Sequence, residues 1–544
     1  MEDESSVGPG GNSGNNDNLP SRGVKREGQD LLSPTSRGKI AKHTFSTSPR
    51  QTRPAPFGMT YPNGGLRITR TPGRRRTKNC VGLGDIIDKD HLVSACIFAF
   101  YIADEELFQH LPISRRSADP VPIYIGRDAN NDPFLQSAAI RAGIPLTEGK
   151  LTKKSLDTLR PHLADQHKTH SHSGGGQNLH AFYAWSPGSA HSKILLLVYP
   201  AFLRIVITSC NMMDADTVLG DNHWYIHDVP RRRDERASRP PAGFEGTLLT
   251  HMEALRTPPA FLDSVRGWYD YSSVKVYLVT SHPGTFSGPL KAEQHGLLRL
   301  RKIVRHLGLN LGRDKPDDDD DDDNEQVRLE VCTASVGSIS ARWLSAFYKC
   351  ALGRQDIRVP EEEENNEVVP DIKLFYPSVD DVRSASADSQ DAASNIGCHL
   401  RPWNTAPQAV KRIFHHYHSR DIGRLFHQKL IMAYNPDQPH APPHYIYVGS
   451  ANLSQSAWGS VAEDKTKKGN EATCHTKLAG VFNFECGVVI PGRLISDLLE
   501  PGTESWEDGV VPYDRAAAPY DLKRDKPWND PRWVKGYSHD YEAL

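Results

Sequence analysis

One pattern occurs twice in this sequence, and it constrains the fold more than any other feature. Each copy consists of His-x-Lys, a short apolar run, a turn, a second apolar run and Ser-x-Asn. The asparagine follows the lysine by 18 residues in the first copy and by 23 in the second. The chain therefore holds two related halves, whose polar positions are His191, Lys193 and Asn211 in the first and His427, Lys429 and Asn452 in the second.

The apolar runs predict strands that hold these polar residues together. Residues 194–198 and 430–433 are apolar throughout, which is typical of strands buried on both faces. His and Lys two positions apart on a strand point to the same face. A returning strand brings the asparagine beside them, so each half presents one imidazole, one ammonium and one carboxamide.

Attack on a phosphodiester is the chemistry that uses two such sets. Its transition state spreads negative charge over the non-bridging oxygens, which Lys and Asn side chains stabilise without a metal. One neutral imidazole attacks phosphorus, and the other protonates the leaving oxygen and later deprotonates water. A two-metal site needs clustered carboxylates, which the motifs lack. Asp214 and Asp216 lie nearby, and we expect them to start a helix or to face solvent.

A single His-x-Lys carries little information. His475 and Lys477 form a third instance, but no Ser-x-Asn follows at the required distance, and we treat it as incidental. The complete pattern is much harder to obtain twice by chance. The functional interpretation therefore depends on the pair of motifs.

The remaining folded sequence indicates an α/β architecture in two lobes. Short apolar runs alternate with helical stretches, and apolar residues at helical spacing predict a helix over residues 91–110. We expect the lobes to cover residues 83–288 and 289–544, with the turn-rich stretch 281–289 between them.

Residues 1–82 are expected to form a disordered basic tail. They are rich in Gly, Ser, Asn and Pro, and up to Lys78 they hold 14 Lys and Arg against 6 Asp and Glu. Basic clusters lie at residues 25–26 and 74–76. Such clusters serve as nuclear addresses or contact DNA phosphates, but solvated tails carry them equally often.

Several polar stretches are predicted to be solvated loops. The acidic insertion 317–323 is a run of seven aspartates and 361–364 a run of four glutamates, and neither has the spacing of a calcium loop. Residues 380–395, rich in Ser, Ala and Asp, are predicted to be a surface insertion. We also expect a loop, rather than a metal site, at His167, His170 and His172.

Composition bears on the compartment of the protein. No apolar run reaches the ~18 residues that span a bilayer, and the N-terminus opens with acidic residues rather than an apolar signal segment. We therefore expect a soluble intracellular protein. The eight cysteines include no CxxC pair, which favours reduced thiols over a disulfide framework or a zinc site.

The two motifs resemble the duplicated His-Lys signature of the phospholipase D superfamily, and more closely that of the eukaryotic tyrosyl-DNA phosphodiesterases, of which we expect a fungal member. Most of the superfamily has an Asp five residues after the Lys, where this sequence has Val198 and Tyr434. The lack of that Asp is typical of the tyrosyl-DNA branch and argues against a lipid-cleaving enzyme. The likeness runs from about residue 83 to residue 528, and its specific strings lie at 335–338, 376–379, 449–459 and 527–528.

The resemblance implies a role for each motif residue. The implied catalytic set is His191 as nucleophile, His427 as general acid and base, and Lys193, Lys429, Asn211 and Asn452 as the groups that hold phosphoryl oxygens. Glu485 matches an acidic residue that orients a catalytic histidine. Asn222 falls where the family has a Gln, and its amide is shorter. Ser335 and Ser454 match serines that contact the DNA strand.

The family removes a tyrosine left on a DNA 3′ end by a stalled type IB topoisomerase and leaves a 3′-phosphate. The resemblance therefore implies a DNA-repair phosphodiesterase that works through a phosphohistidine, without cofactor or metal. It also implies a fold of two similar lobes, each a mixed β-sheet flanked by helices, with the site on their pseudo-twofold seam. We expect a nuclear monomer whose partners are DNA with a 3′-blocked end, single-stranded or duplex, and the attached topoisomerase peptide.

Two other functions stay open at this point. One is another metal-independent phosphodiesterase of the superfamily, such as a nuclease or a lipid hydrolase, which a panel of substrates in chelator distinguishes. The other is a catalytically silent DNA-repair scaffold that keeps the fold. The presence of both complete motifs disfavours the scaffold.

Overall fold

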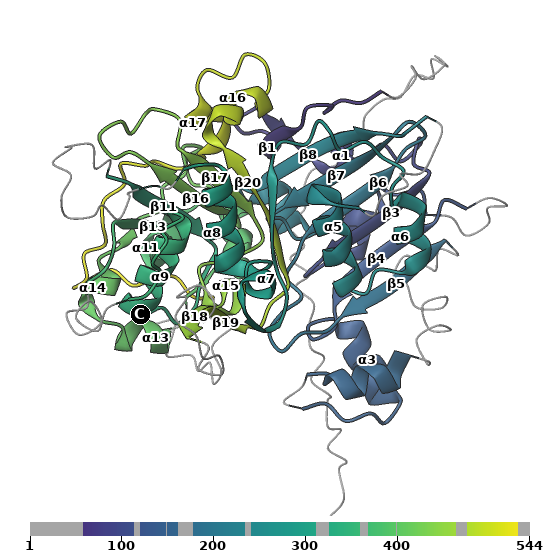
Figure 1. Cartoon of the computed structure of the whole chain (residues 1–544), viewed down its shortest axis with the longest axis horizontal. Coiled ribbons are helices and arrows are strands. Elements are labelled where there is room, and N and C mark those ends of the chain that lie inside the picture. The colour runs from purple at the N-terminus through teal and green to yellow at the C-terminus, as the bar shows by residue number, and fades with distance from the viewer. Residues whose placement is uncertain are drawn as a thin grey trace, which may run out of the picture. The chain divides into compact units, whose positions relative to one another are not determined.

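The computed structural model describes residues 58–113, 120–147, 150–160, 178–233, 241–309, 311, 326–359, 368–398, 400–463 and 476–530. The predicted tail up to residue 57, the three loop histidines, both acidic runs and His475 lie outside these ranges. Within them the chain forms a mixed α/β structure, in which two large sheets carry helices on their faces (Figure 1). No described helix is both long enough and apolar enough to cross a membrane.

The first lobe is built on an eight-stranded mixed sheet. Its strands are β1 (Gly65–Thr69), β2 (Cys80–Val81), β3 (Ser94–Ala99), β4 (Ile123–Asp128), β5 (Leu179–Ala184), β6 (Ile194–Val198), β7 (Phe202–Thr208) and β8 (His223–Pro230). Their spatial order is β2-β1-β8-β7-β6-β3-β4-β5. The strands β3, β4 and β5 run parallel to one another. On the other side of β3 every pairing is antiparallel as far as β1: β3 with β6, β6 with β7, β7 with β8 and β8 with β1.

The second lobe is built on a seven-stranded mixed sheet. Its strands are β9 (Tyr277–Ser281), β11 (Arg328–Thr333), β13 (Ile372–Phe375), β15 (Phe414–His415), β16 (Lys429–Tyr434), β17 (Tyr445–Gly449) and β20 (Glu485–Pro491), in the spatial order β15-β13-β11-β16-β17-β20-β9. Two small sheets accompany it, formed by β10 (Gly284–Ser287), β18 (Ser460–Glu463) and β19 (Thr476–Val481), and by β12 (Ser335–Val336) with β14 (Gly397–Cys398).

Helices cover the faces of both sheets. In the first lobe they are α1 (Leu83–Ile86), α2 (Asp104–Phe108), α3 (Pro133–Arg141), α5 (Gly243–Ala254), α6 (Pro259–Val265) and a π-helical turn, η1 (Ala215–Leu219). In the second they are α7 (Pro289–Ala292), α8 (Gly296–His306), α9 (Ala341–Ala351), α11 (Val379–Ser384), α12 (Ala387–Gln390), the 3-10 turn η2 (Asp391–Asn395), α13 (Leu400–Thr405), α14 (Gln408–Lys411), α15 (Gln455–Trp458) and the 3-10 turn η3 (Gly492–Leu494). The last two helices, α16 (Ile495–Leu498) and α17 (Trp506–Val510), pack against β1 of the first sheet.

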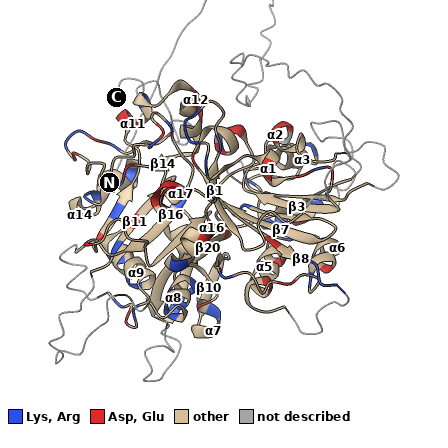
Figure 2. Ribbon diagram, turned by 90° about the horizontal axis from the view of Figure 1, so that it is seen from above, with Lys and Arg blue, Asp and Glu red and all other residues tan. Residues whose placement is uncertain are grey.

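Amphipathic sequence explains how α8 and α9 attach to the second sheet. In α8 the apolar Leu297, Leu300 and Val304 recur at helical spacing and are buried, while Arg305 is exposed. Lys and Arg on α8 are visible in Figure 2. The side chain of Ser340 caps α9 by accepting the Trp343 N–H.

The two motifs lie on equivalent hairpins, one in each sheet. β6 pairs antiparallel with β7 so that Ile194 faces Ile207, and β16 pairs with β17 so that Leu430 faces Val448. Each His-x-Lys thus leads into a buried central strand, and each Ser-x-Asn follows the returning strand. β17 and β20 pack against β7, and apolar side chains of both sheets form one continuous core.

One secondary-structure prediction was wrong. Residues 94–99 form the central strand β3, and only the short α2 falls within the helix predicted over residues 91–110. All six residues of β3 are buried because both faces of this sheet are covered. A strand buried on both faces has no alternating pattern, so its apolar residues also match helical spacing.

The lobe boundaries also differ from the predicted ones. The first lobe begins before residue 83, because β1 joins its sheet beside β8 and the described chain from residue 58 to 82 is folded. The second sheet already includes β9, which precedes residue 289. Residues 380–395 are not a simple surface insertion, since η2 buries Ala392 and Ala393.

We predict that Gly487→Ala destabilises the second lobe. Gly487 on β20 packs directly under the ring of Tyr447, and an added Cβ would overlap that ring. Tyr447 is fully buried and its hydroxyl accepts the N–H of Ala451 in the second Ser-x-Asn motif. The substitution should lower the free energy of unfolding by about 1–3 kcal/mol, as overpacking does, in chemical denaturation. Gly58→Ala is the control, because its Cβ meets nothing within 4 Å; equal stability of the two variants would contradict this packing argument.

Candidate active site

The two motif histidines lie side by side at the junction of the lobes. His191 stands at the start of β6 and His427 at the start of β16, and their ring centroids are 6.5 Å apart with an angle of 78° between the planes. They are 8% and 4% exposed. Two segments more than 200 residues apart therefore bring both imidazoles together.

Each histidine is held through its backbone by the opposite lobe. The N–H of His191 donates to the carbonyl of Phe484 at 2.9 Å, and the N–H of His427 donates to the carbonyl of Asp221 at 3.0 Å. Both contacts belong to isolated parallel bridges between the lobes. The position of each imidazole thus depends on the lobe that does not contain it.

Each imidazole is also paired with a carboxylate of the opposite lobe. Nδ1 of His191 lies 3.0 Å from Oε2 of Glu485, and Nδ1 of His427 lies 2.8 Å from Oδ2 of Asp216. A carboxylate only accepts, so the hydrogen bond at His191 places the proton on Nδ1, whereas Nδ1 of His427 lies within ion-pair distance of Asp216 without a hydrogen bond among the described residues. The lone pair of a neutral imidazole is then on Nε2, where it can attack phosphorus or exchange a proton.

Asp216 is the functional residue that sequence reasoning missed. We expected it at a helix start or on the surface; it does lie in the first turn of η1, but it is fully buried there. Its Oδ2 accepts the N–H of Asn211 at 2.7 Å and its Oδ1 accepts the amide of Asn395 at 2.9 Å. The available signal was its position five residues after the first motif asparagine, which has no counterpart in the second motif.

Glu485 is supported in the same way. Ser450 of the second Ser-x-Asn donates to Oε2 at 2.5 Å, and the amide of Asn483 donates to Oε1 at 2.9 Å. The serine of that motif therefore helps to fix the carboxylate that orients His191. Glu485 is 1% exposed, so these bonds replace the water it loses on burial.

The two lysines occupy equivalent places. Nζ of Lys193 donates to the carbonyl of His191 at 2.6 Å, and Nζ of Lys429 donates to the carbonyl of His427 at 2.5 Å. Both side chains are buried, and Lys193 also lies over the ring of Phe100 at 5.4 Å. Each ammonium keeps donor capacity for a phosphoryl oxygen.

The two motif asparagines are held differently. The amide oxygen of Asn452 accepts from the N–H of Ser335 at 3.0 Å and from the hydroxyl of Thr333 at 3.1 Å, so its NH2 group is left to donate. In Asn211 the backbone N–H binds Asp216, while within the described chain the amide oxygen makes no hydrogen bond. Both carboxamides can therefore contact a substrate.

The remaining predicted residues have supporting positions. Both polar atoms of the Asn222 amide are engaged inside the lobe, by the hydroxyl of Ser209 at 2.7 Å and the carbonyl of Asp216 at 2.9 Å. Asn222 thus braces the turn that carries Asp216 instead of facing the phosphoryl site. The Ser454 hydroxyl caps α15, and Ser335 presents its N–H to the second motif, so contact of either hydroxyl with DNA stays a prediction.

Comparisons with known proteins agree with this geometry. A family model described as tyrosyl-DNA phosphodiesterase matches residues 66–530. The chain belongs to the tyrosyl-DNA phosphodiesterase family. Curated members of the family include tyrosyl-DNA phosphodiesterase 1 of Arabidopsis thaliana, which is 26% identical over 297 residues, and a probable tyrosyl-DNA phosphodiesterase of Schizosaccharomyces pombe, which is 20% identical over 294 residues.

These alignments cover 52% and 53% of this chain but only 45% and 50% of the two relatives, so the chain spans about half the length of the curated relatives it matches. A crystal structure of the yeast tyrosyl-DNA phosphodiesterase aligns with a TM-score of 0.57 and 15% identity, over 86% of this chain and all of that chain. The solved structure shows that the family fold is present, including the two lobes with their mixed sheets.

Burial controls the protonation of the site. Desolvation lowers the pKa of His191 to about 4 and that of His427 to about 3, against the opposing effect of the paired carboxylates. Burial likewise lowers the pKa of Lys193 to about 7 and that of Lys429 well below its usual range. At Asp216 burial raises the pKa, but His427, Lys429 and the N–H of Asn211 outweigh it and lower the pKa to about 2.

The described residues include one group that could hold a metal, and it is separate from the histidine pair. It consists of Asp381, His416 and His418. Both nitrogens of His416 are already directed at carboxylates, Nδ1 at Asp381 and Nε2 at Asp525, each at 3.0 Å. The ring thus bridges α11 and the segment before residue 528, and the structure gives no further support for a metal.

We predict that kcat/KM for a phosphodiester substrate stays high well below pH 6.5. A histidine that attacks phosphorus must be neutral, and the lowered pKa of His191 keeps this ring neutral until the pH approaches about 4. The same shift means that the unfolded chain binds more protons than the folded chain between pH 6.5 and 4. The free energy of unfolding therefore decreases as the pH is lowered from 6.5 to 4. Circular dichroism at each pH separates unfolding from titration; an acid limb centred near pH 6.5 in folded protein would contradict the assignment.

Proposed function

We propose that this protein hydrolyses the phosphodiester bond between a tyrosine and the 3′ end of DNA, through a covalent intermediate on His191 and without a metal. The observation that carries the proposal is the pair of imidazoles, 6.5 Å apart, each oriented by a carboxylate of the other lobe and flanked by a buried ammonium. Family membership supports the tyrosyl-DNA bond as the substrate.

In the first step Nε2 of His191 attacks phosphorus and the bond to the tyrosine oxygen breaks. The ammoniums of Lys193 and Lys429 stabilise the charge on the non-bridging oxygens. A phosphodiester brings negative charge beside His427 and favours its imidazolium form, which supplies a proton to the leaving phenolate. The products of this step are free tyrosine or peptide and a phosphohistidine.

In the second step water attacks the phosphohistidine. Nε2 of His427, neutral again, accepts a proton from the water while the bond between phosphorus and His191 breaks. The product is a DNA 3′-phosphate. Both steps use groups present in the chain, so neither needs a cofactor.

The location and the DNA form belong to the same proposal. We place the protein in the nucleus as a monomer that acts on blocked 3′ ends of single-stranded or duplex DNA. The basic clusters of the amino-terminal region support this location, and imaging of the tagged full chain tests it. Sedimentation tests the oligomeric state, and binding to a blocked duplex that weakens steeply with salt supports contact with DNA phosphates.

The deciding experiment offers three substrates in excess chelator: a 3′-phosphotyrosyl oligonucleotide, an unmodified oligonucleotide and phosphatidylcholine. We expect rapid release of tyrosine from the first and little reaction with the others. Turnover of the unmodified oligonucleotide or the lipid at a similar rate would favour a nuclease or a lipid hydrolase. Binding of DNA without turnover of any substrate would favour a scaffold.

We predict that the two histidine variants fail in different ways. His191→Ala should abolish turnover and form no covalent adduct, because the nucleophile is gone. His427→Asn should still release tyrosine, since a phenol leaves easily, but should accumulate enzyme–DNA adduct, because the base for the second step is missing. Denaturing gels with labelled DNA measure the adduct. Retention of full activity by both variants would refute the mechanism.

A further inference from the structure

The carbonyl that holds His427 belongs to a residue with an unusual side-chain environment. Asp221 donates its N–H to Leu425 at 2.9 Å and accepts the N–H of His427 at 3.0 Å, so its backbone clamps the segment that ends in the catalytic histidine. Its carboxylate is fully buried. The equivalent residue at the other histidine is Phe484, whose apolar side chain packs in the core.

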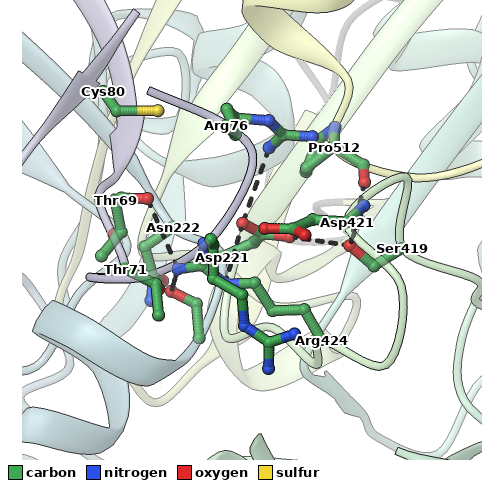
Figure 3. A network of polar contacts seen from close by, with 12 residues as sticks. Thr69, Thr71, Arg76, Cys80, Asp221, Asn222, Ser419, Asp421, Arg424 and Pro512 are labelled. Carbon is green, nitrogen blue, oxygen red and sulfur yellow. Dashed lines mark hydrogen bonds and ion pairs between the residues drawn. The ribbon is translucent and has the colours of Figure 1, made fainter. Parts of the chain in front are cut away.

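Two arginines supply the opposite charge to this buried carboxylate. Nε of Arg424 lies 3.3 Å from Oδ1 of Asp221 and Nη1 of Arg76 lies 3.6 Å from the same oxygen (Figure 3). Oδ2 receives weak bonds from the hydroxyls of Tyr417 and Ser419 at 3.4 and 3.3 Å. Figure 3 shows Arg76, Ser419 and Arg424 around Asp221, on separate segments of the chain.

The two arginines are not equivalent. Arg424 is 1% exposed and also donates to three backbone carbonyls around it, so its place is fixed by many bonds. Arg76 comes from the stretch between β1 and β2, in the basic cluster of residues 74–76, and its side chain is 14% exposed. Its neighbour Arg75 is exposed, and Arg74 binds Asp388.

A buried carboxylate is costly unless its charge is compensated, and loss of one partner leaves the local structure strained. The least costly response at Asp221 is movement toward water, which shifts the backbone carbonyl of the same residue. That carbonyl is the acceptor for His427. A change at Arg76 therefore acts on the position of His427 without touching the site itself.

We propose that Arg76 is a positioning residue for His427, acting through the buried Asp221. The proposal depends on the proposed function, because it assigns Arg76 to the two-step reaction described above. It makes one residue of the basic cluster a part of the catalytic apparatus, while its neighbour in sequence stays on the surface.

The two steps depend on His427 to different degrees. The proposal therefore predicts different effects on the rate of phosphohistidine formation and on the rate of its breakdown. A phenolate leaves with little help from an acid, whereas water needs the base. Misplacement of His427 should therefore slow breakdown of the phosphohistidine more than its formation. With an alkyl alcohol in place of tyrosine, the leaving group needs the acid, and both steps should slow together.

Rapid-quench kinetics with a 3′-phosphotyrosyl oligonucleotide test this. The wild-type chain, Arg76→Ala, Arg76→Lys and Arg75→Ala are compared after active-site titration, so that each rate refers to folded enzyme. Arg76→Ala should slow adduct breakdown by about tenfold or more and tyrosine release by less than about threefold, the range expected for a disturbed general base. Arg76→Lys should restore breakdown in part, and Arg75→Ala should match the wild type.

Each other outcome has a distinct meaning. Equal slowing of both steps in Arg76→Ala, or no rescue by Arg76→Lys, would reduce Arg76 to a structural ion pair. Equal effects of Arg75→Ala and Arg76→Ala would point to general attraction of DNA by positive charge. Unchanged kinetics in Arg76→Ala with an active wild type would overturn only this inference, whereas an inactive wild type would overturn the proposed function.

Discussion

The rest of this structure depends on a reciprocal clamp between the lobes. His191 is held by the carbonyl of Phe484 and the carboxylate of Glu485, both from the second lobe, and His427 by Asp221 and Asp216, both from the first. Neither lobe alone contains an oriented histidine. Both histidines therefore depend on the contact between the lobes for their positions. One apolar core runs through both sheets and holds the lobes together.

The clamp is symmetric in function but not in sequence. Asp216 lies five residues beyond the first motif asparagine, in a π-helical turn, whereas Glu485 lies on a strand well beyond the second asparagine. The two copies therefore share the histidine, lysine and asparagine, but their carboxylates come from positions that do not correspond. The buried ion pairs of Asp221 have no counterpart at Phe484, so the support of the two histidines differs as well.

The sequence predicts those parts of the site that a repeated motif or a continuous apolar run specifies. The duplicated motif locates the six polar positions, and continuous apolar runs predict β6 and β16, because a strand buried on both faces needs apolar residues throughout. The roles of Asp216 and Asn395 could not be predicted from the sequence, because they depend on chain segments that only folding brings together. The strand β1 was not predicted for a related reason. The polar sequence on both sides of it is typical of a disordered tail, and only the pairing with β8 makes it part of the sheet.

Charge balance within the buried site gives a physical account of the metal-free reaction that we propose. The carboxylates of Asp216 and Glu485 favour the ammonium forms of Lys193 and Lys429 against the effect of burial, and both imidazoles stay neutral because burial opposes their charge. In a medium of low dielectric constant an added charge interacts strongly with the charges around it. A phosphodiester adds one negative charge, and protonation of one imidazole restores the balance. In the proposed reaction the substrate therefore creates the general acid it needs.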